Sequence, residues 1–294
     1  MNKILNVCIN QTFDYISCAT TSGYEIYQIK PFNKKHEYNF NGSLSLTHML
    51  YSTNIIVCVG GIHVPTYKNS KSIFIWDMNT KEQINSYLCC QPISSILINH
   101  RHIIINYQDH IEILSLNTCK SLTKFKTCMS PSSACKVYNN VSLLAFTSYK
   151  EGNVRLWKKN TIIELKVHDS SIVDIHLSVK CDTLVTISHN HIKTYDIESL
   201  KLIHCITINQ LQSNLKYSII DEQCEYILLY FTNELMHIFE IKSGMFWNLF
   251  IENVLFAFFL TKQHKNYPKI CVLKKDKTLH TFQLLKYGNI IRII

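Results

Sequence analysis

Histidine and cysteine are the side chains of this sequence that are best suited to metal binding or nucleophilic chemistry. The sequence holds 14 His and 12 Cys. His189 and His191 flank a single residue and Cys89 and Cys90 are adjacent, but neither spacing is that of a structural zinc site. The sequence contains no glycine-rich phosphate loop, nucleophile elbow or His-Glu-x-x-His motif. We therefore expect no catalytic residue, no metal and no cofactor, and the protein is not expected to be an enzyme.

The cysteines instead fit an apolar interior. Cys8, Cys18, Cys58 and Cys271 stand inside apolar, strand-like runs, where a free thiol behaves as a small hydrophobic group. No apolar run approaches the ~20 residues that a membrane-spanning helix needs, and residues 1–7 become polar too early for a secretory signal. We expect a cytoplasmic protein with reduced cysteines.

The positive charge comes almost entirely from lysine. Lys and Arg number 30 against 21 Asp and Glu, a net charge of +9. Only Arg101, Arg155 and Arg292 are arginines. The lysines are scattered and no aromatic platform for single strands is apparent, so we expect no nucleic-acid partner.

One type of segment recurs along the whole chain and must position any site. It is an alternating strand followed by a polar turn, and it recurs about every 42 residues. Its last residue is aromatic or large and apolar in all seven copies: Tyr27, Trp76, Leu114, Trp157, Tyr195, Phe239 and Phe282.

This period, with four strands in each copy, is typical of a WD40-type β-propeller. The third copy predicts strands near 93–98, 101–106, 110–115 and 121–126. We therefore expect an all-β chain, with residues 1–294 forming a single seven-bladed β-propeller of twenty-eight strands. Trp76 and Trp157 are expected to pack between neighbouring blades.

Several segments resemble the PROPPIN family, the WIPI-type phosphoinositide-binding propellers of autophagy. Residues 5–12, 21–27 and 30–32 follow the first blade of that family in order. Residues 48–56 and 59–61 resemble its second blade, and residues 92–97 resemble the start of its third. An unrelated WD40-like interaction scaffold without lipid binding is the alternative.

The resemblance implies a scaffold that recruits autophagy proteins to membranes carrying phosphatidylinositol 3-phosphate. The family's Phe-Arg-Arg-Gly signature falls on Ile206-Thr207-Ile208-Asn209, so both arginines are absent. A phosphate is gripped best by a charged, bidentate guanidinium, which neither Thr nor Ile can replace. We therefore expect weakened lipid binding.

The resemblance also places other lipid-binding positions in the fifth and sixth blades. They are His168, Ser188, Lys193, Thr207, Thr232 and His237. A histidine at the place of His168 also fits an internal hydrogen-bond network, and His237 also fits a structural role on its strand.

Two further features could favour a membrane surface. Phe246 and Trp247 follow a short turn where the family has a long loop, although they also suit a buried outer strand. Basic residues gather around the seventh blade, although such a run also suits a solvated face: Lys262, His264, Lys265, Lys269, Lys274, Lys275 and Lys277.

The resemblance in the first three blades, where the family docks its large lipid-transfer partner, slightly favours partner binding as the better preserved activity. The candidate residues lie in the loop after Gly61 and are His63, Val64, Pro65 and Tyr67, although this loop could also be only a flexible tip. The resemblance implies a protein partner such as the autophagy lipid-transfer protein. We expect a monomer that associates peripherally with autophagosomal or endosomal membranes.

Overall fold

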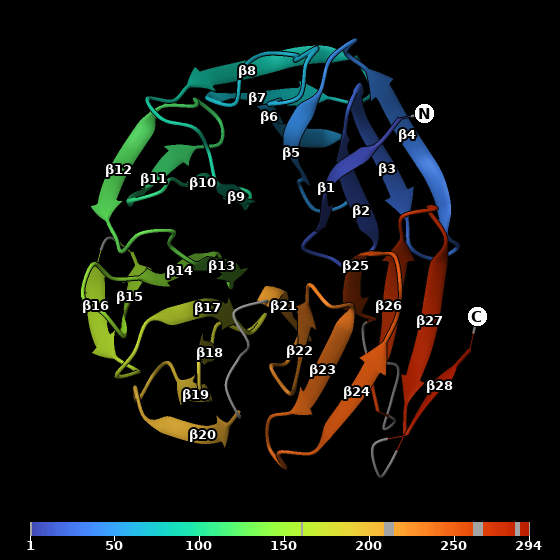
Figure 1. Ribbon diagram of the computed structural model, residues 1–294. Coiled ribbons are helices and arrows are strands. Elements are labelled where there is room, and N and C mark those ends of the chain that lie inside the picture. Colours follow the sequence, from blue (N-terminus) through green and yellow to red (C-terminus); the bar gives the residue numbers. More distant parts are fainter. Residues whose placement is uncertain (1, 160, 209–214, 261–266, 286–288, 294) are drawn as a thin grey trace. The chain divides into compact units, whose positions relative to one another are not determined.

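The computed structural model describes residues 2–159, 161–208, 215–260, 267–285 and 289–293, and the chain divides into two compact units, residues 1–131 and 132–294. Over the described residues it contains twenty-eight strands and no helix (Figure 1). The strands of the first unit are β1 (Ile4–Ile9), β2 (Tyr15–Thr20), β3 (Gly23–Gln28), β4 (Asn33–Asn39), β5 (Leu44–Met49), β6 (Ile55–Gly60), β7 (Ser72–Asp77), β8 (Glu82–Leu88), β9 (Ser95–Ile98), β10 (His102–Asn106), β11 (His110–Ser115) and β12 (Ser121–Lys126).

The strands of the second unit follow the same plan. They are β13 (Ser133–Tyr138), β14 (Val141–Thr147), β15 (Asn153–Lys158), β16 (Thr161–Lys166), β17 (Ile172–Leu177), β18 (Thr183–Ser188), β19 (His191–Asp196), β20 (Leu202–Thr207), β21 (Leu215–Ile220), β22 (Tyr226–Phe231), β23 (Leu235–Glu240), β24 (Phe246–Phe250), β25 (Val254–Phe259), β26 (Lys269–Lys274), β27 (Leu279–Leu284) and β28 (Ile290–Arg292).

Every four consecutive strands form one antiparallel sheet, three sheets in residues 1–131 and four in residues 132–294. Each sheet corresponds to one copy of the repeat, and the anchor residue lies on its third strand in all seven cases. The last described strand, β28, pairs with β27, so the seventh sheet uses only its own strands. The predicted all-β, seven-bladed organisation is confirmed.

Burial differs in a regular way among the four strands of each sheet. The second and third strands are largely buried, as in β22, where all six residues are buried. Their β-branched and aromatic residues pack well on a pleated surface. The fourth strands are the most exposed, as in β4, β8 and β16. The tight turn between β13 and β14 uses Asn139 and Asn140, both with positive φ, which a two-residue hairpin of type I′ requires.

Each pair of neighbouring sheets within a unit shares an apolar cluster. Trp76 of the second sheet packs against Tyr38 and Phe40 of the first, with ring centroids 4.9 and 4.8 Å away. This confirms the predicted place of Trp76 between blades. Trp157 is only half-buried and takes a smaller part in the interior.

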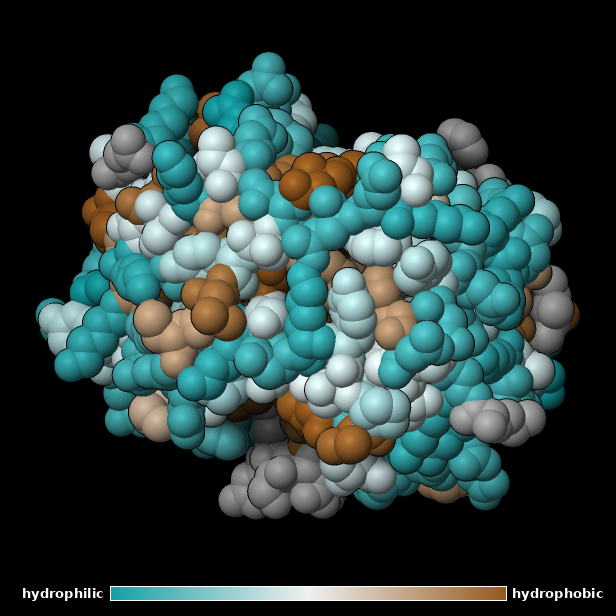
Figure 2. All heavy atoms as spheres, turned by 90° about the horizontal axis from the view of Figure 1, so that it is seen from above, coloured by the Kyte–Doolittle hydropathy of each residue, from teal (hydrophilic) through white to brown (hydrophobic). Residues whose placement is uncertain are grey.

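The cysteines agree with the expectation of reduced thiols. All twelve cysteines are free thiols, and Cys89 and Cys90 come just after β8. Figure 2 shows one face of the molecule, on which hydrophilic residues predominate and apolar side chains form separate patches. Within the described ranges, no helix exists that could cross a bilayer.

Candidate functional sites

The fifth sheet positions four of the predicted lipid-binding residues. His168 lies between β16 and β17, Ser188 ends β18, Lys193 lies on β19 and Thr207 ends β20. In the strand register Lys193 lies opposite Thr186 of β18, and Thr207 lies opposite His191 of β19.

His168 is an internal residue, with only 2% of its surface exposed. Its Nε2 lies 2.9 Å from Oγ1 of Thr186, a residue that the sequence reasoning missed. Burial, together with the positive charge of Lys193, lowers the pKa of His168 to about 4. The imidazole is therefore neutral near pH 7 and supplies no positive charge for a phosphate.

Lys193 is also engaged by the protein itself. Its Nζ donates a hydrogen bond to the carbonyl of Val167 over 2.9 Å, and the hydroxyl of Tyr195 donates to the same carbonyl over 2.9 Å. An ammonium group has three donors, so this bond leaves capacity to reach an anion. Lys193 is thus the one positive charge among the six predicted lipid-binding positions.

The two hydroxyl groups among the predicted residues of the fifth sheet, those of Ser188 and Thr207, differ in their exposure to solvent. Ser188 is fully buried, and its Oγ accepts a hydrogen bond from His191 N over 3.2 Å, which closes the turn between β18 and β19. Thr207 is exposed at the end of β20. Of the two, only Thr207 presents a surface position.

The second arginine position is occupied by an apolar contact. The backbone N–H of Ile208 donates a hydrogen bond to the carbonyl of Asn190 over 2.8 Å. The side chain of Ile208 packs with Ile206 against an apolar cluster. That cluster joins the fifth and sixth sheets and includes Phe231 and Phe239. Asn209, the last residue of the aligned signature, lies outside the described residues.

The other two predicted lipid-binding residues, Thr232 and His237, lie in different environments of the sixth sheet. Thr232 is exposed in the turn after β22, whereas His237 lies on β23 with its ring centroid 5.1 Å from that of Phe231. Burial lowers the pKa of His237, although a hydrogen bond with Asn248 acts in the opposite direction. The ring therefore lies in a mainly apolar environment.

The residues that were expected to favour a membrane surface differ in their exposure. Trp247 is fully buried and donates its Nε1–H to the carbonyl of Leu285 over 2.8 Å, whereas Phe246 is exposed. Lys269, Lys274, Lys275 and Lys277 lie on or beside β26. Lys262, His264 and Lys265 lie outside the described residues.

The predicted partner-binding residues lie in the loop between β6 and β7, which is held against Ser43. Ser43 N donates to the carbonyl of Pro65 over 2.7 Å, and Tyr67 N donates to the carbonyl of Ser43 over 3.2 Å. A Cβ added to Gly61 would lie 2.1 Å from Ser43 Oγ, so only glycine allows this close approach.

The loop therefore has an inner side and an outer side. Tyr67 belongs to the inner side, because its ring stacks on Phe40 with centroids 4.2 Å apart. His63, Val64 and Pro65 belong to the outer side, where Val64 is 93% exposed. Ile62, which the sequence reasoning missed, adds a second apolar side chain that is 66% exposed.

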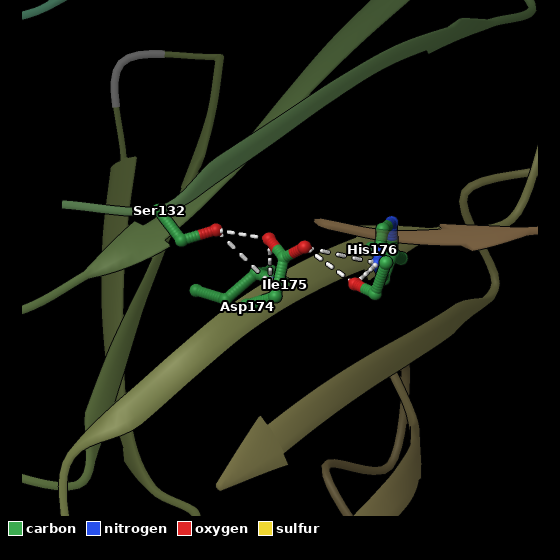
Figure 3. A network of polar contacts seen from close by, with 5 residues as sticks. Ser132, Asp174, Ile175 and His176 are labelled. Atoms are coloured by element: carbon green, nitrogen blue, oxygen red, sulfur yellow. Dashed lines mark hydrogen bonds and ion pairs between the residues drawn. The ribbon is translucent and has the colours of Figure 1, made fainter. Parts of the chain in front are cut away.

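A polar network of the second unit contains the residue types of a catalytic triad without its arrangement (Figure 3). Ser218 Oγ lies 2.7 Å from His176 Nε2 and donates to Asp174 Oδ2 over 2.5 Å. In a triad the serine and the carboxylate contact opposite nitrogens of the imidazole. Here Ser218 and Asp174 both face Nε2 of His176, the carboxylate at 3.5 Å.

The same carboxylate connects three neighbouring sheets. Asp174 of β17 accepts hydrogen bonds from Ser132, just before β13, over 2.6 Å and from Ser218 of β21. Burial acts to raise its pKa, but His176 and the two hydroxyls lower it to about 2. The network therefore holds strands together rather than activating a nucleophile.

No group of three or more His, Cys, Asp or Glu residues in the described part of the chain is arranged to hold a metal ion. His189, His191, Cys89 and Cys90 all lie in this described part.

Comparison with known proteins agrees with the fold and with the resemblance, although no family model matches the chain. Autophagy-related protein 18e of Arabidopsis thaliana is 25% identical over 197 residues, which cover 63% of this chain and 51% of that protein. Across the curated relatives considered, the matched part covers 28% to 54% of the relative's length.

Solved structures extend the likeness to the whole fold. Kluyveromyces lactis Hsv2 superposes with a TM-score of 0.79 at 14% identity, covering 100% of this chain and 98% of that one. KlAtg21, solved in complex with the coiled coil of AgAtg16, gives a TM-score of 0.78 at 18% identity, covering 99% and 98%. The chain therefore has the fold of a seven-bladed β-propeller, and its sequence is similar to those of autophagy-related proteins.

Proposed function

We propose that this chain is a non-enzymatic scaffold that recruits autophagy proteins to membranes carrying phosphatidylinositol 3-phosphate, with weakened lipid binding. The names of its sequence relatives support a role in autophagy. The observation that supports weakened lipid binding is the packing of Ile208 against an apolar cluster. Ile208 stands where the family has a phosphate-binding arginine.

The lipid part of the proposal depends on how little positive charge the candidate pocket offers. His168 is neutral near pH 7, and the ammonium of Lys193 already donates to a carbonyl. One partly engaged ammonium is a much weaker phosphate ligand than two bidentate guanidinium groups. We therefore propose residual binding through Lys193 and the exposed Thr207, aided by diffuse lysine attraction.

The partner part of the proposal depends on the loop between β6 and β7. Backbone hydrogen bonds link Pro65 and Tyr67 of this loop to Ser43, and Ile62 and Val64 of the same loop are exposed. Apolar side chains that gather on a surface can mark an interaction site. KlAtg21 was solved with a coiled coil, so a propeller of this fold can carry a protein partner. We propose that the loop contacts an autophagy protein such as the lipid-transfer protein.

The proposal includes a monomeric, cytoplasmic protein that is peripheral on autophagosomal or endosomal membranes. It also treats residues 1–294 as a single propeller domain. The alternative is a protein-interaction scaffold without lipid binding, which the internal hydrogen bonds of His168 and Lys193 favour.

Vesicle flotation with the Thr207→Arg variant tests the lipid part. Thr207 is exposed, so an arginine fits there without disturbing the interior, whereas Ile208 is packed and would be a poorer choice. We expect weak flotation of the unmodified protein with phosphatidylinositol 3-phosphate vesicles, and a gain of about tenfold in affinity for the variant.

The matched control is Thr80→Arg, which adds the same charge at an exposed turn of the first unit. A gain for Thr207→Arg alone supports a pocket in the fifth sheet. An equal gain for both variants would show diffuse attraction only. Tight, headgroup-selective and salt-resistant binding by the unmodified protein would refute the weakened pocket.

A further inference from the structure

A thiol and an imidazole from neighbouring sheets meet in the first unit. Cys8 Sγ of β1 lies 2.7 Å from His48 Nε2 of β5, and both residues are partly exposed. The thiol also lies 3.4 Å from the carbonyl of Ile9, which is a weaker acceptor for it. The imidazole is therefore the close partner of this sulfur.

The two strands are fixed relative to each other at this point. The buried Ser17 places its hydroxyl 3.3 Å from the carbonyl of Cys8 and 3.1 Å from that of Thr47, the neighbour of His48. Asn10 donates to the carbonyl of Tyr51 over 2.8 Å at the end of the same strand pair. Bonds on both sides thus hold the sulfur against the imidazole.

We propose that Cys8 and His48 form a thiolate–imidazolium pair that makes Cys8 a site of oxidation by hydrogen peroxide. An adjacent imidazolium favours the thiolate, which is the nucleophilic form of cysteine. Several other thiols are in the opposite situation, because burial raises the pKa of Cys89 and Cys181 to about 11. The His48 contact thus distinguishes Cys8 from these inert thiols.

The oxidation step uses one peroxide and one proton from the pair. The thiolate sulfur attacks one peroxide oxygen, a sulfur–oxygen bond forms and the oxygen–oxygen bond breaks. Sulfur loses two electrons and becomes the sulfenic acid, while the peroxide is reduced to hydroxide. The imidazolium of His48 gives its proton to the hydroxide, so the products are sulfenic acid, water and neutral histidine.

The first test compares thiols within the unmodified protein. Iodoacetamide is applied at pH 6 to the folded chain, and the modified cysteines are quantified by peptide mass spectrometry. Cys90 and Cys205 are the internal controls, because both are exposed and, among the described residues, neither thiol has an imidazole within hydrogen-bond distance. We expect Cys8 to react about tenfold faster, since the gain in thiolate outweighs its lower nucleophilicity.

The second test removes the imidazole and then supplies the oxidant. His48→Gln keeps a polar side chain of similar length and should reduce the reaction of Cys8 to the rate of Cys205. After hydrogen peroxide treatment, dimedone should trap sulfenic acid on Cys8 in the unmodified protein and not in the variant. The proposal fails if Cys8 reacts no faster than Cys205, or if dimedone labels both proteins equally.

Discussion

The third strand of each sheet carries a recurrent position two residues before its anchor, and the charge at this position differs between the two units. In residues 1–131 it is occupied by Glu25, Phe74 and Glu112. In residues 132–294 it is occupied by Arg155, Lys193, His237 and His280. An anion that reaches this position meets a carboxylate or a phenyl ring in the first unit. In the second unit it meets the charged side chain of Arg155 or Lys193, or an imidazole whose pKa is lowered mainly by burial, at His237 and His280. We therefore expect any phosphate pocket at this level of a sheet to lie in residues 132–294.

The two units also stabilise these charges in different ways. Glu112 is 1% exposed and accepts hydrogen bonds from the hydroxyls of Tyr87 and Tyr107 over 2.9 and 2.8 Å. Arg155 pairs over 3.2 Å with Glu164, and both side chains are partly exposed. The acidic positions are thus part of the interior, whereas the basic ones lie nearer to the solvent.

The largest expected effect is the loss of a buried acid. Glu112→Ala leaves the hydroxyls of Tyr87 and Tyr107 without their acceptor, and it removes the partner of Lys124 at 3.2 Å. We expect a loss of about 3–5 kcal/mol in the free energy of unfolding, measured by urea denaturation.

The control for this experiment is Glu37→Ala, because Glu37 lies on the exposed strand β4 of the same unit. A loss of less than about 1 kcal/mol is expected for it. If Glu112→Ala cost no more than the control, the buried acids would not be a distinguishing feature of the first unit.

The next effect is a pH dependence that comes from the second unit. The pKa of His168 is about 4 in the folded protein, because burial and Lys193 oppose its positive charge. Since this lies below the ordinary ~6.5, the unfolded chain binds the proton more readily. The contribution of His168 to the free energy of unfolding is therefore fully present above pH ~6.5. It is lost as the pH falls through about 4, which lowers the free energy of unfolding by about 3 kcal/mol.

Denaturation of the unmodified protein and of His168→Gln across this pH range measures the contribution. Groups that titrate equally in both proteins cancel in the difference. We expect the two stability curves to converge as the pH falls. Parallel curves would show that His168 is not held neutral by its surroundings.

The sequence predicted the strands well because alternation and turn residues are local signals. It did not reveal the contacts between sheets, although these follow a simple rule. Ser132 and Asp174 are 42 residues apart, and Cys8 and His48 are 40 apart. Equivalent strands of neighbouring sheets lie side by side, so polar residues one repeat apart are the natural partners.

The same reasoning explains what was missed around the candidate sites. Thr186 lies two residues before Ser188 on the same strand, so strand alternation places both on one face, and it bonds His168. The exposure of Ile62 had no such signal, because it depends on how Ser43 holds the loop.

A smaller effect is expected for the ion pair of the second unit. Arg155→Ala removes the partner of Glu164, but Glu164 keeps hydrogen bonds from Ser148 and Asn153 over 3.0 and 2.9 Å. It also removes the guanidinium that lies 4.8 Å from the ring centroid of Tyr149. We expect a loss of about 1 kcal/mol in urea denaturation, well below that of Glu112→Ala. A loss as large as that of Glu112→Ala would remove the contrast between the units.

The smallest effect on stability, and the most informative one for the lipid site, is expected for Lys193→Met. The carbonyl of Val167 keeps its bond from Tyr195, so the loss should be at most about 1 kcal/mol. The positive charge that helps to lower the pKa of His168 is removed, so this pKa should rise. It should stay below the ordinary value, because burial is the larger cause and is unchanged. Proton NMR titration of His168 measures this shift. An unchanged pKa would show that Lys193 does not act on His168, and the two residues would then no longer be parts of one site.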